Sequence, residues 1–345
     1  MTHEQVYHDF HVHVGERIGG YQLRDGFKEL NLLRRPEHAS QGVPLGSVGV
    51  FVSEEPGQSL KDKYESMREH AAAEFEGEVF WHLSPVKTKA EDVIPLLGKH
   101  SDLKLYSTYR EAGLYSSYEA IEHWMLASEA TKTRILVHCE DDATLQEYSQ
   151  IHPFRYPHDH CLRRPEIAEL RAVERVLDLA IKHNHPVHIV HVSTPQAAIL
   201  IQAAKKVYPG ITCETAPHYL LYNEERLCGP DAHRWICTPP FRSEHSRGLL
   251  VELLQDGVFD ILASDHCAFR DIDKDRFKDN PEKVPCGIAG IRELYASPQQ
   301  NLVESGKLKG DMLDRLCRIN PARLMNISIQ EDVWKKHIET MPMPK

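Results

Sequence analysis

Several features that mark other protein classes are absent from this chain. No apolar run approaches the roughly 18 residues that cross a membrane as a helix. The first residues, MTHEQVYHDF, contain neither the basic nor the apolar region of a secretory signal peptide. The formal net charge is −10, which disfavours nucleic acid and anionic membranes as partners. We therefore expect a cytoplasmic protein that binds no nucleic acid and no membrane.

Paired cysteines and a glycine-rich phosphate turn are also missing. The eight cysteines include no Cys-X-X-Cys pair. In a chain of 345 residues without a signal peptide, scattered cysteines indicate reduced thiols rather than a disulfide framework. No Gly-X-Gly-X-X-Gly turn follows the first predicted strand, which argues against a doubly wound dinucleotide-binding fold.

The chain does contain a regular alternation of short apolar runs and longer amphipathic ones. Strands are predicted at residues 6–14, 47–53, 78–86, 102–109, 134–140, 186–193, 211–220 and 259–266. A helical pattern follows each of them, and several strands are apolar on both faces, as in a sheet that is covered on both sides. This order predicts an α/β fold of the (β/α)8 barrel type. The longest loops, 141–164 and 267–286, should cover the mouth of the barrel.

Histidine is the abundant reactive residue, with 22 copies. His11 and His13 lie two residues apart in the first predicted strand, so their side chains point to the same face. Other polar residues lie towards the ends of four further predicted strands: Lys104, His138, His191 and Asp265. Any one of these residues alone is explained by a hydrogen bond in the core or at a helix end. Together they predict one site, because a barrel places its active site at the carboxyl ends of its strands.

Four imidazoles and a carboxylate are suitable ligands for zinc or a similar divalent ion. A lysine ammonium group cannot bind a metal, but carbon dioxide can add to the neutral amine and give a carbamate with two ligating oxygens. Such a carbamate on Lys104 can bridge two ions that share a hydroxide. The predicted cofactors are therefore two divalent ions, with Zn²⁺ as the first choice.

From about residue 6 to residue 327, the chain resembles the cyclic amidohydrolases of the amidohydrolase superfamily, which include hydantoinases, dihydropyrimidinases, allantoinases and dihydroorotases. The resemblance rests on an ordered series of motifs: HVH (11–13), KLYSTY (104–109), VHCED (137–141), HVST (191–194), CETAPHYLL (213–221), TPPFR (238–242), SDHCAF (264–269) and NPARLMNI (320–327). It implies a metal-dependent hydrolase that opens the C–N bond of a small cyclic amide or imide.

The resemblance also implies a role for each residue of the site. One ion would be held by His11, His13 and Asp265, the other by His138 and His191, with carboxylated Lys104 between them. Asp265 would take a proton from the attacking hydroxide and pass it to the leaving nitrogen. Tyr109 would donate a hydrogen bond to the developing oxyanion; the alternative is an aromatic residue at the barrel rim with a satisfied hydroxyl.

The motifs do not decide which cyclic amide is the substrate. In hydantoinases, main-chain atoms hold the cyclic amide edge at positions that correspond to Thr238 and Cys286. Dihydroorotases commonly have an arginine where this chain has Gly15 and a histidine where it has Phe269. A hydantoin or dihydropyrimidine ring is therefore favoured, and dihydroorotate is the alternative. Three loop arginines are candidates for binding an acidic substituent, the nearest first: Arg17, Arg110 and Arg155.

Relatives commonly carry a small β-sandwich formed from both ends of the chain. Here the first strand begins near residue 6 and 18 residues follow Ile327. We expect a barrel domain over residues 1–327, a short extension over 328–345 and no accessory β-sandwich, and we expect the chain to form a homo-oligomer. A non-catalytic scaffold is the alternative to an enzyme, but the filled ligand positions argue against it.

Overall fold

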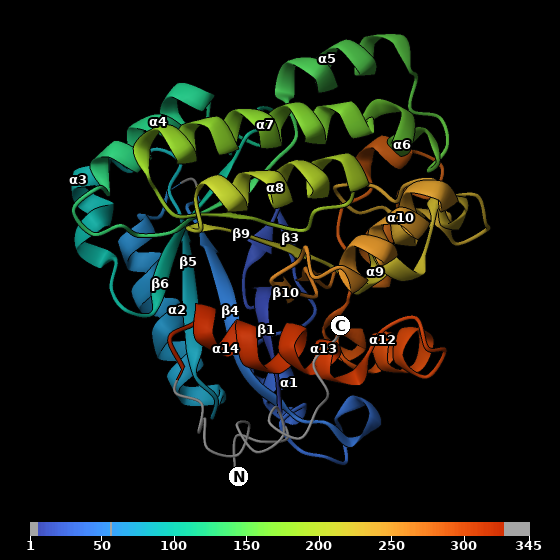
Figure 1. Cartoon of the computed structure of the whole chain (residues 1–345), viewed down its shortest axis with the longest axis horizontal. Coiled ribbons are helices and arrows are strands. Elements are labelled where there is room, and N and C mark those ends of the chain that lie inside the picture. Colours follow the sequence, from blue (N-terminus) through green and yellow to red (C-terminus); the bar gives the residue numbers. More distant parts are fainter. Residues whose placement is uncertain (1–5, 56, 328–345) are drawn as a thin grey trace.

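The computed structural model describes residues 6–55 and 57–327 (Figure 1). Its main sheet is parallel, in the order β10-β9-β8-β7-β6-β5-β4-β1-β11. The strands are β1 (Tyr7–His13), β4 (Leu45–Ser53), β5 (Val79–Ser84), β6 (Ser101–Tyr106), β7 (Ile135–His138), β8 (Val187–Ile189), β9 (Ile211–Thr215), β10 (Ile261–Leu262) and β11 (His266–Cys267). β10 pairs with β9 and β11 pairs with β1, so the segment that contains both closes the curled sheet. The α/β barrel expected from the sequence is confirmed.

Helices connect successive strands and cover the outside of the sheet (Figure 1). The α-helices are α1 (Phe27–Leu32), α2 (Leu60–Glu74), α3 (Ala90–Val93), α4 (Tyr118–Ala127), α5 (Asp142–Ile151), α6 (Asp159–Arg163), α7 (Glu166–His183), α8 (Pro195–Val207), α9 (Pro217–Leu221), α10 (Glu244–Gln255), α11 (Asp271–Asp275), α12 (Ala296–Pro298), α13 (Gly310–Asp314) and α14 (Asn320–Leu324). Short 3-10 turns are η2 (Ser40–Gly42), η3 (Ile94–Leu96), η4 (Glu224–Leu227), η5 (Ala232–Trp235), η6 (Pro281–Lys283) and η7 (Ile291–Glu293), and π turns are η8 (Gln299–Val303) and η9 (Arg315–Ile319).

The longest helix, α7, shows why these segments form helices against the sheet. Its buried residues include Ala168, Ala172, Val176 and Ala180, which recur every four residues and form one apolar face. Glutamates lie in its first turn and cations in its last turn, which complements the helix dipole. It ends at Asn184, which adopts the left-handed conformation with φ 45°.

Three details of the sequence-based prediction were wrong. Residues 141–164 are not a loop, because they contain α5 and α6; Asp141 caps α5 by accepting a hydrogen bond from Thr144 N at 2.9 Å. The strand predicted at 211–220 stops at Thr215, since Pro217 starts α9. The helix expected over 287–306 is broken into η7, α12 and η8.

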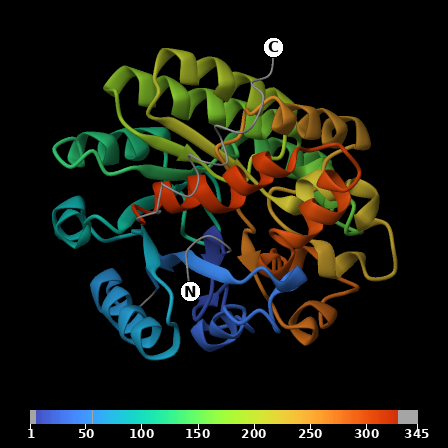
Figure 2. The same cartoon turned by 60° about the horizontal axis from the view of Figure 1, so that its bottom comes forward.

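Apolar side chains fill the barrel interior towards its amino end. Phe10, Phe51 and Phe80 form one buried cluster there with Ala322 and Met325 from the carboxyl-terminal helical segment. In Figure 2 this segment, in red, crosses the end of the barrel. Its polar side chains bond to backbone carbonyls that precede the strands: Asn320 Nδ2 to Asp260 O and Asn326 Nδ2 to Lys99 O, each at 2.7 Å. The amino end is therefore closed, which leaves the carboxyl end for a site.

Within the described residues, the other sheet is a two-stranded antiparallel ribbon, β2 (Arg17–Ile18) with β3 (Tyr21–Gln22). The absence of an accessory β-sandwich stays a prediction, and the expected extension 328–345 lies outside the described residues. No helix in the described part of the chain is long and apolar enough to cross a membrane.

Candidate metal centre

The two histidines of the HVH motif lie at the carboxyl end of β1, with ring centroids 5.4 Å apart. His11 Nε2 is 3.0 Å from Asp265 Oδ1, and His13 Nε2 is 3.9 Å from the same oxygen. One ligand atom from each of these three residues lies within 4.8 Å of the others. Two imidazole nitrogens and a carboxylate oxygen at this spacing fit one divalent ion.

The second pair of predicted ligands lies beside the first. His138 is the last residue of β7, His191 follows β8, and their ring centroids are 4.5 Å apart. The His191 ring is also 5.5 Å from that of His11, so the imidazoles form a continuous row. His191 Nδ1 is buried, and no described residue forms a hydrogen bond with it. An unpaired buried nitrogen in a row of imidazoles fits a site that takes a cation.

Lys104 lies in β6 and is 1% exposed. Its Nζ is 4.9 Å from the ring centroid of Phe51 and 5.0 Å from that of Tyr106. Burial lowers the pKa of Lys104 to about 8, against the opposing influence of Glu214 and Asp265. A lowered lysine pKa provides the neutral amine to which carbon dioxide adds.

Three glutamates orient the imidazoles, and sequence reasoning assigned no role to them. The contacts are His11 Nδ1 with Glu214 Oε1 at 2.5 Å, His13 Nδ1 with Glu16 Oε1 at 3.2 Å, and His138 Nε2 with Glu140 Oε2 at 2.7 Å. A carboxylate that accepts a hydrogen bond from one N–H of a neutral imidazole leaves the lone pair on the other ring nitrogen. His11 and His13 thus present Nε2 to an ion, whereas His138 presents Nδ1.

The charges in this cluster act strongly on one another. Although burial opposes it, Glu214 and Asp265 raise the pKa of His11 to about 9. Burial favours the neutral form of Asp265, but His11 and His191 outweigh it and hold the pKa of that carboxyl well below its ordinary value. Burial lowers the pKa of His138 to about 4. Asp265 is therefore ionised and His138 neutral near pH 7, as metal ligation requires, whereas His11 without an ion holds a proton that a bound ion would have to displace.

Some of the predicted site residues also have an unusual backbone conformation. Positive φ angles are uncommon for residues other than glycine, and they collect at functional sites. Three of the seven such residues in the described chain are predicted site residues: Tyr109 at 67°, His191 at 39° and Asp265 at 50°. The fold therefore holds these side chains in conformations that an unconstrained chain would avoid.

Tyr109 lies next to the second pair of ligands, with its ring centroid 4.9 Å from that of His138. The Arg164 guanidinium lies 5.5 Å from the Tyr109 ring centroid and bonds to Glu140 through Nε at 3.0 Å and Nη2 at 2.6 Å. Burial raises the pKa of Tyr109 well above its ordinary value, so its hydroxyl stays protonated and able to donate.

The predicted substrate-binding residues occupy different surroundings. Thr238 is buried, with Oγ1 3.3 Å from His160 Nε2. Cys286 is exposed, and its Sγ lies 3.8 Å from Val284 O. Arg17 is exposed in the β2–β3 ribbon and donates from Nη2 to Gly20 O at 2.9 Å.

The two other loop arginines lie in local surface contacts. Arg110 donates from Nε to Asp142 Oδ2 at 2.8 Å and stacks 3.8 Å from the Tyr115 ring centroid. Arg155 is exposed, and its backbone N–H donates to Asp159. These arginine contacts therefore do not involve the residues of the predicted metal centre.

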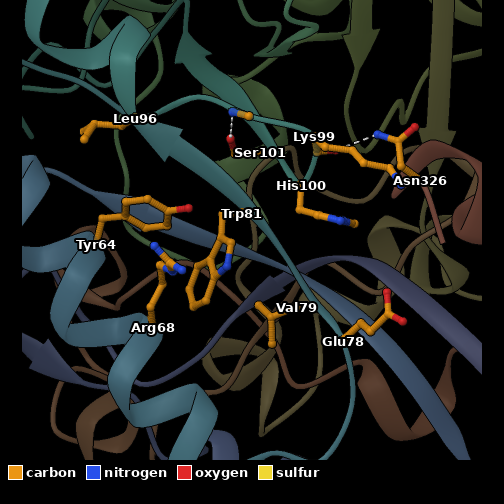
Figure 3. Close-up of a pocket in the computed structure, with 11 residues that line it drawn as sticks. Tyr64, Arg68, Glu78, Val79, Trp81, Leu96, Lys99, His100, Ser101 and Asn326 are labelled. Atoms are coloured by element: carbon orange, nitrogen blue, oxygen red, sulfur yellow. Dashed lines mark hydrogen bonds between the residues drawn. The ribbon is translucent and has the colours of Figure 1, made fainter.

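A cavity of about 670 Å³ opens at the amino end of the barrel (Figure 3). Tyr64, Arg68, Trp81, His100 and Asn326 are among the residues that line it. None of the predicted site residues does, so this cavity is separate from the metal centre.

Comparison with known proteins gives two kinds of relative. The chain is 28% identical over 337 residues to the D-hydantoinase of Ralstonia pickettii, covering 94% of this chain and 71% of the relative. It is 30% identical over 213 residues to the dihydroorotase of Geobacillus sp. (strain WCH70), covering 61% of this chain and 48% of the relative. The chain is thus similar to two kinds of cyclic amidohydrolase, a D-hydantoinase and a dihydroorotase. It spans about half the length of the dihydroorotases that it matches.

The fold of this chain is shared with solved structures. The crystal structure of dihydropyrimidinase from Brevibacillus agri NCHU1002 superposes with a TM-score of 0.84 at 22% identity, over 92% of this chain and 70% of that one. No protein-family model matches the chain.

Proposed function

We propose that this protein is a binuclear metal-dependent cyclic amidohydrolase, which hydrolyses the C–N bond of a cyclic amide or imide. The observation that supports it is the meeting of His11, His13 and Asp265 beside the His138–His191 pair at one end of the barrel. Buried Lys104 projects from the strand between β5 and β7. The relatives, named D-hydantoinase and dihydroorotase, favour the same reaction.

In the proposed site, His11, His13 and Asp265 would hold one ion and His138 and His191 the second, with Lys104 as a further ligand once it is carboxylated. When bound, two divalent ions, Zn²⁺ in our proposal, would supply a nucleophile at neutral pH and polarise the scissile carbonyl. The chain's own groups do the rest. Asp265 accepts the proton of the nucleophile at a carboxylate oxygen and returns it to the leaving nitrogen.

Tyr109 donates a hydrogen bond from its hydroxyl to the carbonyl oxygen as that oxygen gains charge. The backbone at Thr238 and Cys286 holds the amide edge of the ring. Glu214, Glu16 and Glu140 fix the orientation of the ligating imidazoles.

The substrate that we favour is a neutral ring such as hydantoin or dihydrouracil. Gly15 carries no side chain, and Phe269 is buried against Leu23 and Cys267, so neither position offers a charged partner to a carboxylate. An unpaired buried carboxylate is costly, and two lost contacts reduce kcat/KM by up to about 10³-fold. Dihydroorotate is the second candidate, favoured by the names of several relatives.

Kinetics on the full chain, loaded with Zn²⁺ in bicarbonate buffer, test this proposal. Ring opening of hydantoin, dihydrouracil and dihydroorotate is followed by absorbance in parallel reactions. We expect higher kcat/KM for a neutral ring. Preference for dihydroorotate that disappears in Arg17→Ala would assign the second candidate, and metal-loaded protein without any ring-opening activity would favour the scaffold alternative.

We further propose that the protein acts in the cytoplasm as a homo-oligomer, with residues 1–327 as the catalytic domain. Size-exclusion chromatography with light scattering tests the oligomeric state, and a mass equal to one chain would contradict it.

A further inference from the structure

One buried histidine near the metal centre has no role in the site described above. His218 lies in α9, which begins two residues after β9, the strand that carries Glu214. Only 5% of His218 is exposed. Its Nε2 is buried, and no described residue forms a hydrogen bond with it. More than nine in ten buried polar groups are paired in native proteins, so this nitrogen requires a partner that the described chain does not supply.

The surroundings of His218 place it between two parts of the site. On one side, its ring centroid is 4.1 Å from that of Tyr219, whose hydroxyl donates to Pro239 O at 2.7 Å. The Phe241 ring centroid is 6.0 Å away. Both contacts connect the imidazole to residues 238–242, the segment expected to hold the amide edge of the ring.

On the other side lie the metal ligands. His218 follows Glu214 by four residues, and Glu214 Oε1 contacts His11 Nδ1 at 2.5 Å. α9 also follows β9 directly, and β9 lies in the sheet between β8, which precedes His191, and β10, which precedes Asp265. A ring held by the 238–242 segment with its scissile bond at the metals therefore meets His218.

We propose that His218 is a substrate-binding residue, whose Nε2 forms a hydrogen bond with the amide edge of the ring. This inference rests on the proposed function and adds a specificity-determining contact to it. A neutral imidazole has one N–H donor and one lone pair, so it can serve either the N–H or the C=O of that edge. A site with a buried polar group discriminates strongly in favour of substrates that satisfy it.

Three substitutions separate hydrogen bonding from packing. His218→Ala removes both, His218→Phe retains an aromatic ring without a hydrogen-bonding atom, and His218→Gln restores a donor and an acceptor. We expect Ala and Phe to raise KM for hydantoin or dihydrouracil by about 10- to 100-fold, with a smaller change in kcat. Gln should recover most of the loss, and metal content should equal that of the wild type.

A binding measurement makes the test independent of turnover. Uracil has the same imide edge but is not hydrolysed, and its dissociation constant is measured by calorimetry on the metal-loaded full chain. We expect a weakening of about 10-fold or more in the Ala and Phe variants. His183→Ala is the control, because His183 bonds Glu122 at 2.7 Å at the end of α7, and it should change neither KM nor uracil binding.

The outcomes are distinct. A Phe variant with normal KM and normal uracil affinity would overturn the proposal by showing that His218 only packs, and loss of metal in all three variants would overturn it by showing a role in holding the ions. Wild-type protein that opens no ring but binds uracil in a His218-dependent manner would refute the proposed function alone. Wild-type protein that does neither would refute both.

Discussion

The two ends of the barrel are formed by the same strands, yet they hold their polar groups in opposite ways. At the amino end, Arg134 donates to Asp102 at 2.6 Å and to Leu324 O at 2.7 Å, and Asn326 donates to Lys99 O. At the carboxyl end, His191 and His218 each bury a nitrogen that has no partner among the described residues. The paired groups named at the amino end support the fold, and in our proposal the unpaired nitrogens at the carboxyl end serve ions and substrate.

The largest effect should come from removing the one lysine of the metal centre. Lys104→Ala should lose the second ion and reduce kcat by at least about 10³-fold, because the bridge between the ions is gone. Elemental analysis measures the ion content, and ring-opening rates measure kcat. Added short-chain carboxylic acids should restore part of the ion content and part of kcat.

Lys274 provides a matched control for that variant. It is also buried, burial lowers its pKa to about 8, and its Nζ donates to Arg234 O and Ile236 O at 2.9 and 3.0 Å. Lys274→Ala should lower the melting temperature but retain both ions. Equal metal loss in the two variants would contradict a special role for Lys104.

A smaller effect should follow from disturbing the orientation of His138. Glu140→Gln removes the carboxylate that fixes the tautomer of this imidazole, and the affinity for metal should fall by about 10- to 100-fold. Competition with a chelator measures the affinity for metal. The control is Asp142→Asn, which changes a carboxylate that bonds Arg110 and should leave the affinity for metal unchanged. A Glu140→Gln variant with wild-type affinity would show that the contact of Glu140 with His138 does not support the site.

At the amino end, substitutions should change stability and leave catalysis intact. Arg134→Met leaves the Asp102 carboxyl, which is 7% exposed, without its partner and should lower the free energy of unfolding by about 3 kcal/mol. KM should stay within about 2-fold. Chemical denaturation and kinetics test both, and the double variant with Asp102→Leu should recover most of the stability. Loss of activity in the folded single variant would contradict the claim that the amino end determines stability and not catalysis.

The smallest predicted effect is a pH dependence at the amino end. His185 is fully buried and bonds Ser128 Oγ at 3.0 Å, and burial lowers its pKa from 6.5 to about 4. Between pH 6.5 and pH 4 this histidine is protonated in the unfolded chain and neutral in the folded chain. The free energy of unfolding therefore falls as the pH falls, by at most about 1.4 kcal/mol per pH unit. The stability advantage of the wild type over His185→Gln should therefore shrink from pH 7.5 to pH 5. An unchanged difference would contradict this.

The strands, and the meeting of His11 and His13 on one face, were predictable because both follow local patterns. Apolar runs in the sequence predicted each strand, and the spacing of two residues predicted that His11 and His13 point to one face. α5 was missed because His, Pro and Arg after residue 151 made the whole of 141–164 read as loop, although Asp141 is a good helix cap.

The orienting glutamates could not be paired with their histidines from sequence alone. The contact of Glu214 with His11 joins residues 203 positions apart, and it depends on the closure of the barrel. Glu140 did have a local signal, since it lies two residues after His138. Arg164 had none, whereas His218 lies in the motif CETAPHYLL (213–221), to which no role for this histidine was assigned.

The most direct test of the central claim, that the carboxyl end of the barrel is a two-ion hydrolytic site, measures metal content and ring opening in one preparation of the full chain. We predict about two divalent ions per chain, loss of ring opening when a chelator removes them, and its return with Zn²⁺. The double variant His11→Asn/His13→Asn should remain folded, lose the first ion and stay inactive. Full activity in metal-free protein, or in that double variant, would contradict the account.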